Sequence, residues 1–150
     1  MKKIPLVEMY KGGDVRKAAA SVLASGWFIK GPHGESFEKS FARFCSSKEA
    51  CVVNSGTSAL MLIMDALGVG RGDEVIMPSH TFIATATPVI HRGAKPVFVD
   101  VDPVTYTIDP KHVASKIGPR TVGIVAVHLY GHPADMAPLQ KLARKHGLFL

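Results

Sequence analysis

From residue 50 onward, short apolar runs alternate with longer amphipathic segments. Four runs rich in Val, Ile and Ala have the length of strands, and we predict strands over residues 50–54, 74–77, 96–101 and 121–129. The amphipathic segments between and after them predict helices over residues 57–67, 81–92, about 110–118 and 134–146. Apolar strands that alternate with helices are typical of βαβ units. The pattern therefore predicts an α/β fold, a mostly parallel open sheet with flanking helices, with a further strand beginning at residues 148–150.

The first 48 residues show a different pattern. Asp14 is a candidate N-cap for a helix that ends near Leu23, with Gly26 behind it as a stop. A glycine- and proline-rich loop follows over residues 27–34. Phe37 and Phe41, with Phe44 three residues on, recur at helical spacing and predict a second amphipathic helix. We therefore expect N-terminal helices and a loop in residues 1–48, and βα units in residues 49–150.

Composition narrows the functional classes without choosing one. The 150 residues are 47% hydrophobic and 20% charged, which suits one folded domain and excludes a disordered chain. The net charge of +6 is scattered in small groups, so an anionic small substrate is compatible and a nucleic acid is not favoured. The apolar stretch at residues 4–7 is too short for a signal peptide, and no run is long enough to span a membrane. Cys45 and Cys51 lack metal-site spacing, and we expect a cytoplasmic protein with reduced thiols.

Ligands of open parallel sheets bind beyond the carboxyl ends of the strands, so the residues after each predicted strand are the candidates for chemistry. After the first strand, Gly56 allows a tight turn into a helix whose free N–H groups can hold a phosphate, and Thr57 and Ser58 add hydroxyl donors. The same residues also suit an ordinary helix N-cap. This motif has neither the P-loop spacing nor that of GxGxxG.

The other three positions leave alternatives open. Phe82 follows the second strand and either stacks on a planar ring or belongs to the core. Asp100 and Asp102 either hold Mg²⁺ or form a turn with Pro103. His128 and His132 have a zinc-like spacing, but the glycine and proline around them favour a hydrogen-bonded histidine at a strand end. Residue spacing alone thus predicts a phosphate-binding α/β domain without a metal site.

Taken in order, these motifs resemble the DegT/StrS family of pyridoxal-phosphate-dependent sugar aminotransferases, of fold type I. The resemblance covers essentially the whole chain, and the series of motifs is far more specific than any one of them. The matching segments are Gly26–Pro32, Phe37–Glu38, Phe41–Ala42, Asn54–Leu60, Gly72–Ile76, Thr81–Phe82, Gly93–Asp100 and Val127–Gly131.

The resemblance implies site residues and a reaction. It implies that the backbone of Gly56 and Thr57 contacts the phosphate of pyridoxal 5'-phosphate and that Phe82 stacks on the pyridine ring. The loop from Trp27 to Gly31 resembles the segment near the substrate at a dimer interface. The implied activity moves an amino group, usually from glutamate, to a nucleotide-linked keto-sugar, for amino-sugar, polysaccharide or antibiotic-sugar biosynthesis, and the implied assembly is a homodimer.

Two residues of that chemistry are expected after Leu150. The family's Schiff-base lysine and the acid that protonates the pyridine nitrogen both come later than the strand beginning at Leu148, and the lysines present here do not match the motif. We therefore expect residues 1–150 to be the N-terminal part of a large domain, with no catalytic residue and no aminotransferase activity by themselves. A same-fold pyridoxal-phosphate sugar dehydratase and a non-enzymatic phosphate-binding remnant remain alternatives.

Overall fold

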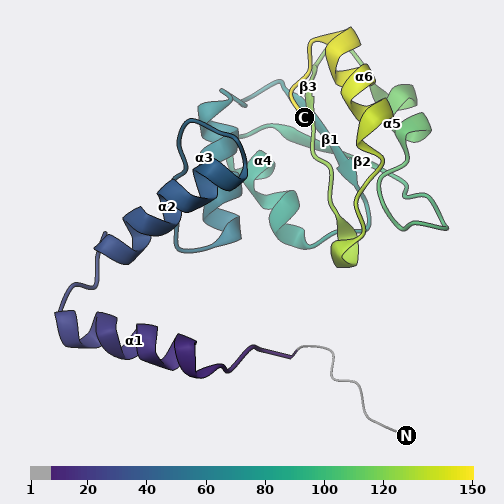
Figure 1. The fold of residues 1–150 in the computed structure, drawn as a ribbon. Helices are drawn as coiled ribbons and strands as arrows, with labels where there is room; N and C mark the ends of the chain where they lie inside the picture. Colours follow the sequence, from purple (N-terminus) through teal and green to yellow (C-terminus); the bar gives the residue numbers. More distant parts are fainter. Residues whose placement is uncertain (1–7) are drawn as a thin grey trace, which may run out of the picture. The chain divides into compact units, whose positions relative to one another are not determined.

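The computed structural model describes residues 8–150 (Figure 1), and the chain divides into two compact units, residues 1–52 and residues 53–150. The expectation that residues 4–7 form no signal peptide lies outside the described residues, and the expected boundary at residue 48 stays a prediction. The elements are, in order, α1 (Gly13–Ser25), α2 (Pro32–Phe44), α3 (Gly56–Ala66), β1 (Glu74–Pro78), the 3₁₀ helix η1 (Ile83–Thr85), α4 (Thr87–His91), β2 (Lys95–Val99), α5 (Pro110–Lys116), β3 (Thr121–Ile124), the 3₁₀ helix η2 (Leu129–Gly131) and α6 (Met136–His146).

A three-stranded parallel sheet forms the centre of the second unit. The strand order is β2-β1-β3, and both neighbours of β1 run parallel to it. Phe149 extends the sheet beyond β3, because the Ile124 N–H donates to the Phe149 carbonyl at 2.9 Å and the Phe149 N–H donates to the Val122 carbonyl at 3.1 Å. The predicted parallel α/β sheet is confirmed, whereas the strand expected to begin near residue 148 is present only as a single parallel bridge between Phe149 and Gly123.

Helices cover both faces of this sheet, and each face has its own core. Alternate residues of a strand point to opposite faces. Accordingly, Ile76 packs with α5 and α6, whereas its neighbours Val75 and Met77 pack with α3 and α4. Figure 1 shows α5 and α6 on one side of the strands and α3 and α4 on the other. β1 is buried on both faces, as its unbroken apolar run predicts.

The structure differs from the predicted elements in three ways. Residues 50–54 form no strand, because the Val52 N–H donates to the Glu38 carboxylate at 2.8 Å instead of to a neighbouring strand. The helix expected over 81–92 is split into η1 and the short α4, because Pro88 has no N–H for a helical hydrogen bond.

The third difference is the length of two strands. β2 ends at Val99 rather than at residue 101, because the Asp100 N–H donates to His112 Nδ1 at 2.9 Å. β3 ends at Ile124 rather than at residue 129, and the chain then turns through η2. In both places the residues beyond the strand become loop, which lengthens the connections at the carboxyl edge of the sheet.

Capping signals in the sequence place most helix ends correctly. The Asp109 carboxylate accepts from the Lys111 N–H at 2.8 Å and begins α5, with Pro110 as its first residue. Gly26 and Gly147 end α1 and α6 in the left-handed conformation. Asp14 is not the N-cap of α1: Gly12 occupies that position, and Asp14 lies in the first turn, where it accepts from the Tyr10 hydroxyl at 3.1 Å.

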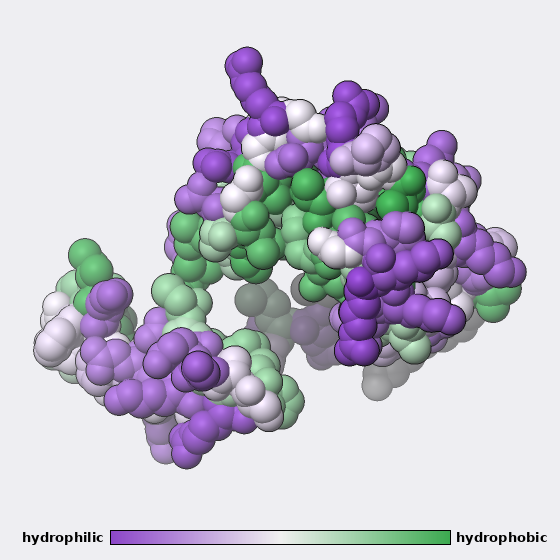
Figure 2. Space-filling model, turned by 90° about the horizontal axis from the view of Figure 1, so that it is seen from above, coloured by the Kyte–Doolittle hydropathy of each residue, from purple (hydrophilic) through white to green (hydrophobic). Residues whose placement is uncertain are grey.

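The first unit exposes much of its apolar surface. α1 buries none of its side chains, so the core-facing stripe expected from Val15 to Leu23 is not covered. On α2 the rings of Phe37 and Phe41 stack at 5.6 Å between centroids, yet both remain exposed. Figure 2 shows hydrophobic residues at the surface of the molecule, with hydrophilic residues bordering them. An amphipathic pattern predicted the helix here, but it did not predict what covers the apolar face.

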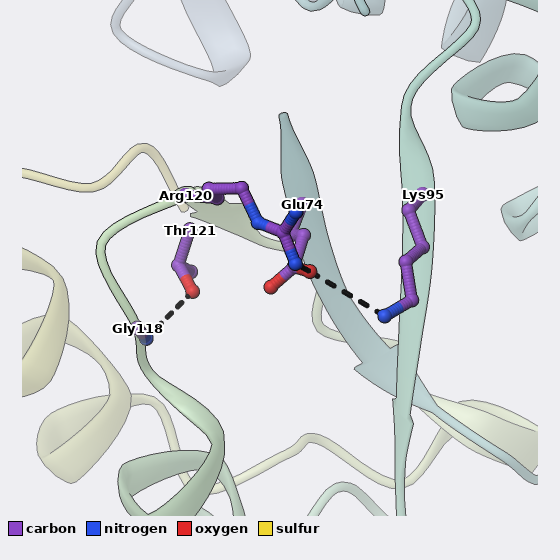
Figure 3. Close-up of polar contacts among 5 residues, drawn as sticks. All are labelled: Glu74, Lys95, Gly118, Arg120 and Thr121. Carbon is purple, nitrogen blue, oxygen red and sulfur yellow. Dashed lines mark hydrogen bonds and ion pairs between the residues drawn. The ribbon is translucent and has the colours of Figure 1, made fainter. Parts of the chain in front are cut away.

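A half-buried carboxylate joins the amino ends of the three strands. Glu74 Oε1, on β1, accepts from Arg120 Nη2 at 2.8 Å and from Lys95 Nζ at 3.4 Å (Figure 3). The Glu74 side chain is 14% exposed, whereas both cations are largely in solvent. Beside it, Thr121 Oγ1 accepts from the Gly118 N–H at 2.9 Å and shapes the turn into β3. The cluster lies opposite the edge where the candidate site residues gather.

We expect Glu74→Gln to lower the free energy of unfolding by about 1 kcal/mol, because it leaves a weaker acceptor in a partly buried position between two cations. Lys95→Gln is the matched control and should change it by less than about 0.5 kcal/mol, since that ion pair is longer and exposed. Urea unfolding at neutral pH measures both. Equal effects of the two substitutions would show that burial of Glu74 does not strengthen the cluster.

Within residues 8–150, no helix is both long enough and apolar enough to cross a membrane. Cys45 and Cys51 are free and exposed.

Candidate functional site

Because β1, β2 and β3 are parallel, the loops that follow them leave the sheet at one edge. α3 leads into the amino end of β1 through residues 67–73, so it runs antiparallel to that strand. An 11-residue helix and a 5-residue strand both span about 16 Å, so the start of α3 lies near the carboxyl end of β1. η1, which follows β1, packs against α3 and supports the same placement.

The start of α3 offers unpaired donors. Ser55 is the N-cap, and its Oγ accepts from the Ser58 N–H at 3.1 Å. Among residues 8–150, no protein group accepts from the backbone N–H of Gly56 or Thr57. A side chain added at Gly56 would meet no atom within 4 Å. The N-cap and anion-site interpretations are thus compatible, because one side chain caps the helix while two N–H groups stay available.

Phe82 lies at the same edge and is 74% exposed, so the interpretation of this residue as core is wrong. It precedes η1 as its N-cap residue. A hydrogen bond of 2.8 Å between the hydroxyls of Thr81 and Thr85 holds this turn. Because η1 packs on α3, the turn that carries Phe82 lies on the side of the sheet that carries α3.

The acidic pair after β2 forms a turn. Asp102 Oδ1 accepts from the backbone N–H groups of Val104 and Thr105 at 2.8 and 2.9 Å. Hydrogen bonds from Thr105 first, and then from Val104, lower the pKa of the Asp102 carboxyl below its ordinary 3.8. Among residues 8–150, no three His, Cys, Asp or Glu side chains are grouped to hold a metal ion. Of the two interpretations weighed for these acids, the structure supports the turn.

The Asp102 turn predicts a pH dependence of stability. A lowered pKa in the folded state stabilises the fold above the ordinary value of 3.8, and this contribution is lost as the pH falls through the lowered pKa. We therefore expect the wild type to exceed Asp102→Asn in unfolding free energy near neutral pH, and the two to converge in acid. Asp135→Asn, whose side chain makes no capping hydrogen bond, is the control and should change the unfolding free energy little near neutral pH. Urea titrations between pH 7 and pH 2.5 measure the difference, and a constant gap would contradict the prediction.

His128, which follows β3, is held by a hydrogen bond within its own loop. His128 Nδ1 accepts from the Ala134 N–H at 3.0 Å, which ties the start of this loop to its end. His128 lies beyond the last residue of β3 rather than at the strand end. The expectation of a hydrogen-bonded histidine is therefore confirmed. Its expected position at the end of the strand is wrong, because His128 lies in the loop after β3.

Trp27 and Gly31 belong to the first unit. The Trp27 indole N–H donates to the Ile29 carbonyl at 2.7 Å, and its side chain remains exposed. Gly31 is the N-cap residue of α2. A cavity of about 460 Å³ within this unit is lined by both residues and by Glu35 and Glu38. The expected approach of this loop to substrate stays a prediction.

The sequence did not single out a cluster of aromatic side chains at the carboxyl edge. The His80 ring meets the rings of Tyr106 and Tyr130 edge to face, at 6.2 and 6.1 Å between centroids. The three residues come from the loops after β1, β2 and β3, and that shared position after a strand is the signal that could have found them.

The residues at this edge fit pyridoxal phosphate in two respects. Two N–H groups at a helix start suit the phosphate dianion, which the helix dipole also favours. An exposed aromatic ring on the adjoining turn suits the face of a pyridine ring.

Comparison with known proteins gives a family match. The model of the DegT/DnrJ/EryC1/StrS aminotransferase family matches residues 10–150. The chain is 51% identical over 137 residues to the erythromycin biosynthesis sensory transduction protein EryC1 of Saccharopolyspora erythraea. The aligned residues make up 91% of this chain and 37% of that protein. It is 50% identical over 133 residues to a dTDP-3-amino-3,4,6-trideoxy-alpha-D-glucose transaminase of Streptomyces venezuelae, covering 89% of this chain and 35% of the relative.

A solved structure agrees with these relatives. The structure of NtdA from Bacillus subtilis with bound cofactor PMP superposes with a TM-score of 0.84 at 38% identity, over 90% of this chain and 31% of that one. The chain thus spans about a third of the length of the proteins that it matches. Their shared features include the parallel sheet and its flanking helices.

Proposed function

The chain belongs to the DegT/DnrJ/EryC1/StrS aminotransferase family, and from that membership we propose that its residues form the cofactor-holding N-terminal part of a sugar aminotransferase. In this proposal residues 49–150 supply the βα units of the large domain, and residues 1–48 supply helices and a substrate-side loop. The reaction moves an amino group, with glutamate as donor, to a nucleotide-linked keto-sugar.

The observation that carries the proposal is the pair of N–H groups at Gly56 and Thr57, which have no acceptor within residues 8–150 and lie on the same edge of the sheet as the exposed Phe82. When bound, pyridoxal phosphate would carry the amino group and take up electrons in its ring. The N–H groups would anchor the phosphate at the start of α3, and Phe82 would cover one face of the ring. Trp27 and Gly31 would lie on the substrate side.

The names of the relatives support this proposal. One is named a transaminase of a dTDP-linked amino sugar, and the solved structure holds PMP. Another is named a sensory transduction protein, so family membership alone does not choose between catalysis and a regulatory role.

A chimera tests the proposal directly. We expect a Streptomyces venezuelae transaminase whose matching 133 residues are replaced by those of this chain to transfer an amino group from glutamate to its keto-sugar nucleotide. The same chimera carrying Phe82→Ala should lose affinity for pyridoxamine phosphate, because one face of the ring would no longer be covered. Product formation by mass spectrometry and cofactor titration are the measurements.

The controls separate the alternatives. The unaltered transaminase is the positive control, and sedimentation of the chimera tests the proposed homodimer. A dimeric chimera that binds the cofactor but does not aminate the keto-sugar would contradict an aminotransferase role for these residues. A folded chimera that binds no cofactor would contradict the proposed function.

A further inference from the structure

Three loops at the carboxyl edge each contribute one ring to a single cluster, which we name the aromatic triad: His80, Tyr106 and Tyr130. The His80 ring lies nearly perpendicular to both tyrosines, with interplanar angles of 83° and 75°. Tyr130 is 86% exposed and Tyr106 is 53% exposed. The triad therefore offers ring faces and polar tips to solvent instead of filling a core.

The backbone at both tyrosines favours glycine over a residue with a side chain. Tyr106 has a φ of 59° and Tyr130 a φ of 55°. This left-handed region costs free energy for a non-glycine residue. Because these rings are exposed, hydrophobic burial offsets little of that free-energy cost. Two strained residues whose side chains meet the same histidine point to a role outside stability.

Hydrogen bonds hold both strained turns in place. The Tyr106 N–H donates to the Asp102 carbonyl at 2.8 Å, within the turn that the Asp102 carboxylate caps. Around Tyr130, the Gly131 N–H donates to the His128 carbonyl at 3.1 Å, and His128 is itself fixed by Ala134. The rings are thus presented by preorganised loops, which lowers the cost of ordering them on binding.

We propose that the aromatic triad binds the uncharged pyranose ring of a nucleotide-linked sugar. This inference rests on the proposed function, because Phe82, the proposed cover of the cofactor ring, follows His80 by two residues. A pyranose has an apolar C–H face that packs on an aromatic ring, and its hydroxyls pair with phenol and imidazole groups. The triad supplies both kinds of contact from three elements.

The charges near the triad favour the sugar over the phosphates of such a ligand. Asp102, four residues before Tyr106 and hydrogen-bonded to its backbone, has a lowered pKa and is a carboxylate at neutral pH. Asp100 is also near this loop and its side chain is 83% exposed. A diphosphate placed against Tyr106 would be repelled by these two carboxylates, in part offset by the Lys111 cation that acts on Asp102, whereas an uncharged ring would not be repelled.

Glycine substitutions separate binding from stability at this site. Tyr130→Gly and Tyr106→Gly remove a ring and also relieve the left-handed backbone, so the unfolding midpoint should not fall. Tyr130→Phe keeps the ring and removes only the hydroxyl. The probes are dTDP-glucose, dTDP without the sugar, and pyridoxamine phosphate, each titrated by NMR against the 150-residue chain and its variants.

We expect each glycine variant to raise the Kd of dTDP-glucose about fivefold while the Kd of dTDP stays unchanged, and Tyr130→Phe to keep most of the affinity. Affinity for pyridoxamine phosphate should be unchanged, so a failure of the triad is distinguishable from a failure of the cofactor site. An unchanged ratio of dTDP-glucose to dTDP affinity in both glycine variants would overturn the proposal. No measurable preference of the wild type for dTDP-glucose over dTDP would also overturn it.

Discussion

Replacing Gly56 by aspartate should raise the Kd of pyridoxamine phosphate for this chain by at least about 30-fold. The proposed phosphate site consists of N–H groups at the start of α3, and the new carboxylate would stand beside them. Two charges about 4 Å apart repel by about 4 kcal/mol at an effective dielectric constant of about 20, and salt screens part of this. Pyridoxamine phosphate is the suitable probe because it has no aldehyde to react with surface lysines.

The variant should remain folded, which makes the loss of binding interpretable. The added side chain meets no atom within 4 Å, and an acidic residue in the first turn interacts favourably with the helix dipole. Ala137→Asp makes the same change of charge in the first turn of α6 and is the matched control, with an expected Kd within about twofold of the wild type. If both variants bind the probe as tightly as the wild type, the phosphate does not lie at α3.

Gly123→Ala should lower the free energy of unfolding by about 1–3 kcal/mol. Gly123 lies on β3 and pairs with Phe149 in a parallel bridge. A Cβ at Gly123 would overlap the ring of Phe149. That ring packs with Val122 and Val125 against the core formed by α3, α4 and β1. The extra methyl therefore forces Phe149 out of its place at the edge of the sheet.

A double-mutant cycle identifies the cause. In the Phe149→Ala background the overlap is absent, so we expect Gly123→Ala to cost less than about 0.5 kcal/mol there. Urea unfolding of the four proteins gives the coupling energy. Equal costs of Gly123→Ala in both backgrounds would show that the strand itself, and not the Phe149 ring, requires a glycine.

Local sequence signals predicted most of this fold because their physical causes are local. The apolar run at residues 74–77 was recognisable as a buried strand, and Asp109 with Pro110 marked the start of α5. Predictions failed where a distant partner decided the outcome. Residues 50–54 look like a strand, yet Glu38 takes the N–H of Val52. Residues 100–101 look like an extension of β2, yet His112 takes the N–H of Asp100.

The candidate site likewise has residues that the sequence predicted and residues that only the structure revealed. The motif around Gly56 and Thr57 was identifiable from spacing and from the family resemblance, because a helix start exposes its N–H groups whatever surrounds it. For Phe82, spacing left a ring-stacking role and a core position open, and the tertiary structure chose by exposing the ring. The triad of His80, Tyr106 and Tyr130 was not identified, since its members are 26 and 24 residues apart in the chain.

By itself, then, the sequence determined a parallel α/β fold, most of the helix ends, and a phosphate-binding motif of a recognisable family. The tertiary structure alone decided which rings face solvent, which loops meet at the carboxyl edge, and that Glu74 ties three strands together. The physical reason is that periodicity and capping depend on neighbours a few residues away. The exposure of a ring and the meeting of loops at one edge depend on how the parallel strands align. That alignment is a property of the assembled sheet.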